Sequence, residues 1–262
     1  MVKLVVSDID GTLFDTDRRL PPDFDYVIER LKELGIYFVL ASGRTYKTIL
    51  RDFEKYKDYI SFICDNGACI VCGGKVVYES ILSHSDMCKA VTACDGIPGL
   101  EVSLCGVRSS YHVITPENAN SEVIRYHAHY TAVDSLLNVD DDIYKIAIFD
   151  KNEAMLNSMP RLKNIFGDRF TMQVSGKYWM DIMHTGTDKG YALKFIQNRL
   201  GISVGETMAF GDYYNDIPML RRAEYGFVMA NAGEDIKQYG KYIAESNKRH
   251  GVTRALRSFF GI

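Results

Sequence analysis

The chain has 262 residues, of which 47% are hydrophobic and 25% are charged, and its formal net charge at pH 7 is −3. These proportions are ordinary for a globular protein and argue against disorder. The acidic balance and the lack of a basic stripe interleaved with aromatics argue against a nucleic-acid surface. No segment approaches the roughly 20 apolar residues of a membrane span, and no export sequence is recognisable, so we expect a cytoplasmic protein without a membrane partner. Nothing in the sequence favours one oligomeric state over another.

The first predicted element is an apolar strand, residues 4–6, which runs into Asp8, Asp10 and Gly11. An unbroken apolar run is typical of a strand buried on both faces, and ligands gather at the carboxyl ends of such strands in open parallel sheets. Side chains at positions i and i+2 of a strand point the same way, so the two aspartates can reach one site. Gly11 allows the backbone to fold close to an anion. The alternative is that both acids are ordinary turn residues.

A second buried strand, residues 36–41, leads into Ser42, Gly43 and Arg44, and a helix is predicted over residues 45–56. A hydroxyl and free backbone amides at the start of a helix form a natural phosphate site. Ser42 is equally suited to be only the N-cap of this helix. Arg44 can pair with a carboxylate instead of touching a substrate, so we leave it out of the catalytic set.

Residues 59–64 and 69–72 are predicted strands, which we expect to pair around an Asn66-Gly67 turn. Cys69 and Cys72 are a weak candidate for zinc, because a structural zinc site needs four ligands, commonly as two close pairs. The other cysteines offer no second pair, and these two fall on opposite faces of a strand. We therefore expect buried free thiols.

The middle of the chain lacks acidic strand ends and follows a different pattern, which we interpret as an inserted α+β cap over residues 83–184 with its own antiparallel sheet. The predicted elements are a helix over 85–94, strands over 100–104 and 111–115, a helix over 117–129, a strand over 143–149, a helical segment over 152–166 broken at Pro160, and a hairpin of strands 170–175 and 179–183.

The last part of the chain returns to buried strands with acidic ends. Lys189 stands at the start of a helix predicted over residues 191–200, and a strand over 207–211 leads into Asp212, Asn215 and Asp216. Taken alone, Lys189 could be a solvated lysine. Asn215 and Asp216 could also cap the helix that follows them, because a proline is favoured in the first turn of a helix.

The strands near Leu4, Phe38, Met208 and Phe227 are expected to form a doubly wound, mostly parallel α/β sheet. Residues 242–244 would add an edge strand, and a final helix over 252–260 would cover one face.

Four polar segments follow one another along the chain, at Asp8, Ser42, Lys189 and Asp212. In this order they resemble the haloacid dehalogenase-like superfamily of phosphohydrolases, and most closely its Cof-like branch. The resemblance covers residues 1–82 and 185–262, which it implies are the catalytic core, and it places the insert between them over the active site. Tyr213 and Tyr214 depart from the pattern, because smaller or more polar residues are expected in the acidic loop. The resemblance rests on Asp8-Ile9-Asp10-Gly11-Thr12, Ser42-Gly43-Arg44, Lys189-Gly190 and Gly211-Asp212 to Asp216, and on the flanking segments Asp65-Asn66-Gly67-Ala68, Asp216-Ile217-Pro218-Met219-Leu220 and Met229-Ala230-Asn231-Ala232.

A phosphate monoester approaching Asp8 is an anion meeting an anion, and two like charges at ~4 Å repel by about 4 kcal/mol at an effective dielectric of ~20. A divalent cation removes this penalty, and carboxylate and carbonyl oxygens are the ligands that Mg²⁺ prefers. We assign Mg²⁺ to Asp8, Asp212 and the backbone carbonyl of Asp10. The resemblance implies the same ligands, with Asn215 and Asp216 supporting the metal or orienting the lysine.

In this interpretation Asp8 is the nucleophile and forms an aspartyl-phosphate, and Asp10 is the general acid and base. Lys189, Ser42 and the amides near Gly43 would hold the oxygens of the transferred group, and Asn215 is a further candidate phosphate ligand.

The best candidates for substrate selection in the cap are Tyr178, Trp179 and Asp181. Trp179 is as well suited to be a packing anchor. We expect a Mg²⁺-dependent phosphomonoester hydrolase acting on small phosphorylated metabolites, with sugar phosphates ahead of nucleotides or pyridoxal phosphate. A sugar phosphomutase with the same nucleophile and a non-catalytic phosphometabolite-binding module are the alternatives.

Overall fold

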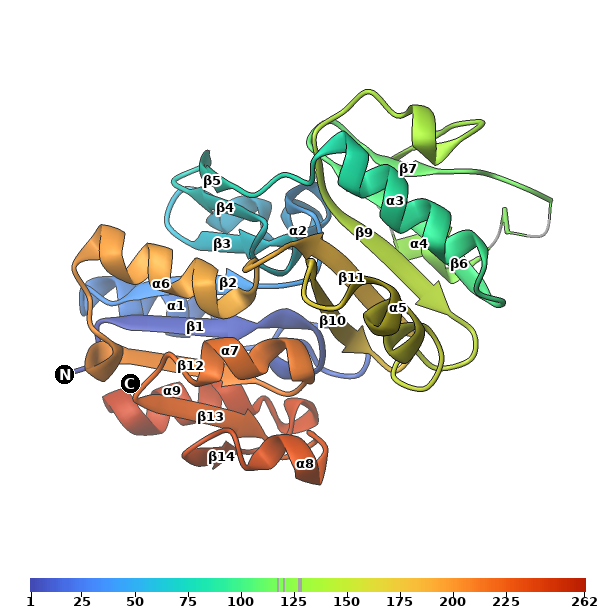
Figure 1. The fold of residues 1–262 in the computed structure, drawn as a ribbon. Coiled ribbons are helices and arrows are strands. Elements are labelled where there is room, and N and C mark those ends of the chain that lie inside the picture. The colour runs from blue at the N-terminus through green and yellow to red at the C-terminus, as the bar shows by residue number, and fades with distance from the viewer. Residues whose placement is uncertain (117, 120, 127–128) are drawn as a thin grey trace.

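The computed structural model describes residues 1–116, 118–119, 121–126 and 129–262, which form two β-sheets flanked by helices (Figure 1). The first and last parts of the chain make the larger sheet, which we call the core sheet, and the middle part makes the smaller one, the cap sheet. The α/β class and the insertion of a second sheet agree with the sequence-based prediction. None of the described helices is long and apolar enough to cross a membrane.

The core sheet has the strand order β14-β13-β12-β1-β2-β3-β4-β5. The strands from β14 to β3 are parallel, and β4 and β5 extend the sheet antiparallel. Its strands are β1 (Leu4–Asp8), β2 (Tyr37–Ala41), β3 (Ser61–Cys64), β4 (Cys69–Cys72), β5 (Lys75–Glu79), β12 (Thr207–Gly211), β13 (Tyr225–Met229) and β14 (Tyr242–Ala244).

Both faces of the core sheet are buried, which explains the unbroken apolar runs in its strands. Val5 belongs to one hydrophobic cluster, whereas its neighbours Leu4 and Val6 belong to another. The Val5 cluster includes residues of α1 and α9, and the other cluster includes residues of α6 and α7. The helices of this part are α1 (Phe24–Glu33), α2 (Tyr46–Phe53), α6 (Lys189–Leu200), α7 (Ile217–Leu220), α8 (Glu234–Lys237) and α9 (Gly251–Phe260).

The cap sheet has the strand order β10-β11-β9-β6-β7-β8. The expectation of an antiparallel sheet is wrong at one edge, because β8 pairs parallel to β7. Its strands are β6 (Leu100–Gly106), β7 (Ser110–His112), β8 (Tyr130–Ala132), β9 (Ile143–Asp150), β10 (Phe170–Gly176) and β11 (Trp179–His184), and its helices are α3 (His84–Asp95), α4 (Glu122–Tyr126) and α5 (Ser158–Phe166).

Two predicted helices of the insert differ from the structure. The helical segment expected over 152–166 begins only at Ser158, and Pro160 lies in the first turn of α5, where the absent N–H costs nothing, so it does not break the helix. Of the helix expected over 117–129, only α4 is helical among the described residues, and residues 118, 119, 121 and 129 lie in turns or bends. Residues 117, 120, 127 and 128 lie outside the described chain.

Alternation along β9 and β11 decides which side chains of the cap sheet face the core sheet. Ile146 and Ile182 belong to the apolar cluster of the cap, together with residues of α3 and α5. Lys145 and Asp181 are one position away in their strands and therefore point to the opposite face. The polar side chains of these two strands are thus aimed at the core part of the molecule.

The close approach of α6 and α7 depends on Gly190. A Cβ atom at this position would lie 2.5 Å from the backbone oxygen of Pro218, which cannot move without shifting α7. We expect Gly190→Ala to lower the free energy of unfolding by about 1–3 kcal/mol through overpacking. Denaturant unfolding measures the change. Gly205→Ala is the control, because a Cβ there meets no atom closer than the Ser203 hydroxyl at 3.8 Å; equal losses in both variants would contradict the packing argument.

Candidate active site

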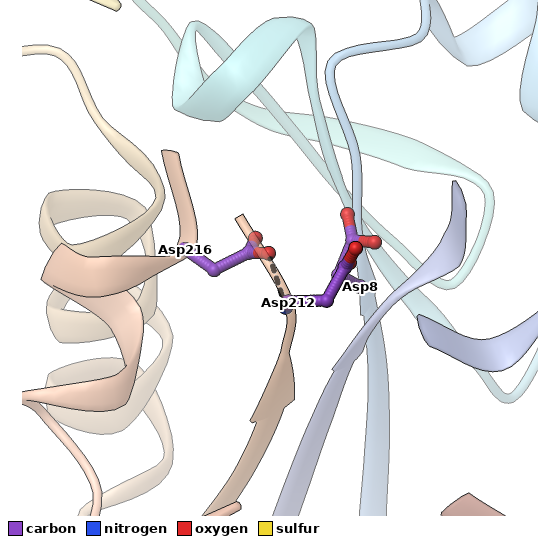
Figure 2. Close-up of side chains that lie close together, drawn as sticks. All are labelled: Asp8, Asp212 and Asp216. Carbon is purple, nitrogen blue, oxygen red and sulfur yellow. Dashed lines mark hydrogen bonds between the residues drawn. The ribbon is translucent and has the colours of Figure 1, made fainter. Parts of the chain in front are cut away.

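The carboxyl ends of two adjacent parallel strands bring acidic side chains together. Asp8 is the last residue of β1, and Asp212 directly follows β12, its hydrogen-bonded neighbour. Carboxylate oxygens of Asp8, Asp212 and Asp216 lie within 4.8 Å of one another, so acids from opposite ends of the chain share one point in space (Figure 2).

The ammonium of Lys189 forms ion pairs with two of these carboxylates. Its Nζ donates to Oδ1 of Asp8 and to Oδ1 of Asp216, both at 2.6 Å, and its side chain is fully buried. The residue begins α6, whose N-cap Asp188 accepts from the Tyr191 N–H. The alternative of a solvated lysine is therefore wrong.

The loop after β12 is held in shape by Asp216. Its Oδ2 accepts the backbone N–H groups of Asp212 and Tyr213 at 3.0 and 3.1 Å, and the first of these bonds is drawn in Figure 2. Thr12 adds a bond of 2.7 Å from its hydroxyl to Oδ1 of Asp212. The Asp212 carboxylate is thereby aimed at Asp8.

Burial and mutual repulsion disfavour the charged forms of these acids. Burial raises the pKa of Asp8 well above its usual value, although Lys189 opposes the shift. Burial, followed by repulsion from Asp216, raises the pKa of Asp212 to about 7. Burial alone would lower the pKa of Lys189, but Asp216 and Asp8 raise it above its usual value, so the lysine stays charged.

The donor set fits a hard divalent cation. When ionised, the three carboxylates and the one ammonium carry a charge of −2, which a divalent ion neutralises, and oxygen atoms are the ligands that Mg²⁺ prefers. Gly11 has φ +83°, and a Cβ there would clash with the Asp212 carboxylate. The backbone beside the acids thus has room only for glycine. The residues present are those that a Mg²⁺ site requires. Asp216 was expected only to support the metal or to orient Lys189, but one of its carboxylate oxygens belongs to the same cluster.

Asp10 is held at the wall of the site by Arg44. The guanidinium Nε donates to Oδ2 of Asp10 at 2.7 Å, a second guanidinium nitrogen contacts Oδ1, and a third donates to Asp52 at 3.0 Å. Arg44 is fully buried, whereas the side chain of Asp10 is 46% exposed. The structural pairing considered for Arg44 is therefore found, and its partner is the predicted general acid.

Ser42 and Gly43 follow β2 at the same edge of the sheet. The Ser42 N–H donates to the Ile63 carbonyl, and its hydroxyl oxygen accepts the Arg44 N–H at 3.1 Å. Thr45 caps α2, since its side chain accepts from the Thr48 N–H. The alternative that Ser42 is the N-cap is therefore wrong.

A cavity of about 270 Å³ lies between these loops and the cap sheet. Of the three cap residues proposed for substrate selection, Asp181 and Trp179 line it, whereas Tyr178 lies in the turn before β11 and does not. Sequence reasoning missed Lys145, although a lone lysine within the apolar run of residues 143–149 was a signal for it. The lining residues are Asp8, Asp10, Arg18, Ser42, Gly43, Glu122, Lys145, Ala147, Ser175, Trp179, Asp181, Asp212, Tyr213, Asn215 and Asp216.

The two tyrosines of the acidic loop have separate roles. Tyr213 lines the cavity and packs against the apolar cluster of the cap sheet. Tyr214 turns away, and its hydroxyl donates to Asp235. Tyr213 is thus a contact between the acidic loop and the cap sheet.

Asp65 is a buried acid next to this region that the predicted chemistry does not use. Neither of its carboxylate oxygens has a hydrogen-bond partner among the described residues. Burial raises its pKa to about 7, with Lys145 opposing and Asp181 adding to the shift. Its φ of +50° is a conformation that asparagine also tolerates.

Asp65→Asn should therefore stabilise the protein at high pH. Between pH 3.8 and about 7 the folded protein keeps a proton that the unfolded chain has released, so the free energy of unfolding falls as the pH rises through this window. We expect the variant to be more stable by about 1–2 kcal/mol at pH 8, less than the full linkage value because the amide is also polar and buried. Thermal unfolding at pH 5 and pH 8 measures a gain that grows with pH. The exposed neighbour Asp58→Asn should show no gain, and a gain independent of pH would contradict the assignment.

The sequence and the fold of this chain match those of known proteins. The family model described as haloacid dehalogenase-like hydrolase matches residues 5–256. The chain is 31% identical over 253 residues to the Escherichia coli protein YbjI, a 5-amino-6-(5-phospho-D-ribitylamino)uracil phosphatase, covering 96% of this chain and 93% of that protein. It is 26% identical to YcsE of Bacillus subtilis, which carries the same name, over 98% of this chain and 95% of that one. The crystal structure of SMU.1108c from Streptococcus mutans superposes with a TM-score of 0.92 at 25% identity, covering all of both chains.

Proposed function

The chain belongs to the haloacid dehalogenase-like hydrolase family and is a phosphatase of small phosphorylated metabolites, and we propose that it acts through an aspartyl-phosphate on Asp8 with Mg²⁺ as cofactor. The observation that carries this proposal is the cluster of Asp8, Asp212 and Asp216 around the buried Lys189 at the base of the cavity. Three largely buried carboxylates with one ammonium among them cost folding free energy, and buried acids with pKa values shifted in this way cluster at functional sites.

The chain's residues supply the parts of a two-step phosphoryl transfer. Lys189 fixes the Asp8 carboxylate, one oxygen of which forms a bond to phosphorus while the bond from phosphorus to the ester oxygen breaks. The electron pair leaves on the ester oxygen, which takes a proton from Asp10. Water, giving a proton to Asp10, then attacks the phosphoryl group, and the bond from phosphorus to the Asp8 oxygen breaks. This step releases inorganic phosphate and regenerates the Asp8 carboxylate. Bound Mg²⁺ would neutralise the acids and the phosphoryl oxygens.

Arg44 gives Asp10 a defined place for both proton transfers. Its two bonds to the carboxylate, with Arg44 itself buried, hold Asp10 at the cavity wall while leaving its side chain accessible. The Ser42 hydroxyl and the Gly43 N–H lie at the same strand ends and supply donors to the phosphoryl oxygens.

The size and lining of the cavity support a polyol or sugar phosphate as substrate. A volume of about 270 Å³ lies at the lower limit of ligand pockets and suits a small metabolite. Arg18, Glu122 and Ser175 provide donors and acceptors for hydroxyl groups, whereas Trp179 offers a flat ring. The Trp179 ring favours, as a second candidate substrate, a phosphorylated ribityl chain on a heterocycle, like that in the names of YbjI and YcsE.

All six cysteines are free, which supports the expected cytoplasmic location because disulfides are rare there.

Asp8→Asn should abolish turnover without unfolding the protein. We expect kcat for phosphate release to fall by at least about 10³-fold, because the amide is a poor nucleophile. Chelation of the divalent ion should have a similar effect on the parent enzyme, reversed by added Mg²⁺. Free phosphate released from a panel of sugar, polyol and nucleoside phosphates measures both effects and ranks the substrates.

The exposed Asp95→Asn in the cap is the matched control and should leave kcat unchanged. An Asp8→Asn protein that works as fast as the parent would remove the mechanism. Isomerised sugar phosphate without free phosphate would identify a mutase instead.

Asp10→Asn should separate the two chemical steps. The leaving group of p-nitrophenyl phosphate needs no proton, so its first step survives, while the second step loses its base and slows by about 10²–10⁴-fold. We expect a burst of one p-nitrophenolate per active site followed by slow turnover, and no burst with an alkyl phosphate. Stopped-flow absorbance measures the p-nitrophenolate burst, and rapid quenching with an assay of the released alcohol tests the alkyl ester. Asp17→Asn, an exposed acid of the following loop, should behave like the parent, and a variant equally slow in both steps with both esters would argue against the role of Asp10.

A further inference from the structure

We propose that Lys145 of the cap sheet is a positioning residue that sets the geometry of Ser42 through the peptide between Gly43 and Arg44. The inference rests on the proposed function and extends it. We call the segment of Ser42 and Gly43 the phosphate-binding turn. The proposal means that this turn of the core is completed by a side chain that the cap sheet supplies.

The peptide between Gly43 and Arg44 is held at both of its polar ends. The Lys145 Nζ donates to the Gly43 carbonyl oxygen at 2.6 Å. The N–H of the same peptide, on Arg44, donates to the Ser42 hydroxyl oxygen at 3.1 Å. Because the peptide is planar, fixing its oxygen also fixes the direction of its N–H. The hydroxyl hydrogen of Ser42 must then point away from that N–H, toward another acceptor such as a phosphoryl oxygen.

Lys145 is itself held by a closed ring of contacts around Gly43. Its Nζ donates to Oδ1 of Asp181 at 2.7 Å, and Oδ2 of Asp181 accepts from the Asn66 amide, also at 2.7 Å. The backbone N–H of Asn66 donates to the Ser42 carbonyl oxygen at 3.0 Å, which closes the ring at the turn. The ring therefore runs from the turn to the core loop before β4, to β11, to β9 and back to the turn.

Burial makes this ring stiff. Lys145 and Asp181 are each 3% exposed and Asn66 is completely buried. A buried ion pair costs desolvation and is maintained only by good geometry and additional hydrogen bonds, so its members have little freedom to rearrange. Asn215 extends the ring to the acidic loop by donating to Asn66 at 3.0 Å. Asn66 thus contacts the Ser42 turn, the cap sheet and the acidic loop.

A lysine in the cavity wall could instead bind the alcohol part of the substrate, and the two roles make different predictions. A positioning residue acts on the phosphoryl group, so its loss affects all esters equally. It also acts through Ser42, so its loss matters little once the Ser42 hydroxyl is gone. A residue that binds the alcohol part would affect sugar phosphates selectively and independently of Ser42.

The test is a double-mutant cycle with Lys145→Met, Ser42→Ala and the double variant. We expect Lys145→Met to lower kcat/KM by about 10–100-fold, by the same factor for p-nitrophenyl phosphate and for a sugar phosphate, and to weaken binding of inorganic phosphate. In the Ser42→Ala background the same change should cost less than about threefold. Lys145→Arg, which keeps a charged donor, should recover part of the loss. Lys151→Met is the matched control, because this exposed lysine pairs only with Glu101 among the contacts described and lies away from the cavity.

Two results would overturn the proposal: independent effects of the Lys145 and Ser42 substitutions, or a loss confined to sugar phosphates. If Lys145→Met does not fold, because Asp181 is left buried and unpaired, the variant Lys145→Met/Asp181→Leu replaces the whole ion pair with apolar groups and serves in the cycle. Calorimetric binding of inorganic phosphate with Mg²⁺ gives the same cycle without turnover. A parent protein that binds phosphate with this coupling but hydrolyses no ester would contradict the proposed function and leave the positioning role standing.

Discussion

The arrangement of this site depends on one buried cation, the ammonium of Lys189, between the carboxylates of Asp8 and Asp216. Without it, β1 and the loop after β12 would place uncompensated like charges together in a buried environment. Buried charges without a partner strongly lower the free energy of unfolding. With it, the cluster keeps a residual negative charge that fits a divalent ion. The helix that carries Lys189 approaches the acids closely only because Gly190 lets it pack against α7.

The cap sheet contributes to the site through simple strand alternation. One set of positions in β9 and β11 builds the apolar cluster under α3 and α5, and the other set presents Lys145, Asp181 and Trp179 to the cavity. Contacts between the two parts of the molecule are therefore mainly polar and directional at the turn of Ser42 and Gly43. At the acidic loop they are apolar, through Tyr213. The Ser42 turn and the acidic loop thus each have a partner in the cap sheet.

Local pattern predicted the core well and the insert less well. The strands near Leu4 and Met208 were recognisable because a strand covered on both faces is continuously apolar, and their acidic ends meet because parallel strands end at one edge. The start of α5 was misplaced because a proline suits the first turn of a helix as well as its end. The parallel edge pair of the cap sheet joins residues whose short strands carry no signal of direction. The roles assigned to the site residues stay predictions.

The sequence by itself determined the fold class, the family and the acids that meet at the strand ends. The hydrophobic period of each strand and the order of the polar segments follow from the linear sequence and do not depend on how the chain folds. Only the tertiary structure decided the pairing of Asp10 with Arg44, the rejection of Ser42 as a helix cap and the place of Lys145 at the Gly43 carbonyl. Ser42 and Thr45 both carry a hydroxyl near the start of α2, and only the backbone geometry selects Thr45 as the cap. Asp10 and Arg44 meet because β1 and β2 pair side by side. The contact of Lys145 with Gly43 depends on how two separately built sheets meet, and no short stretch of sequence contains that information.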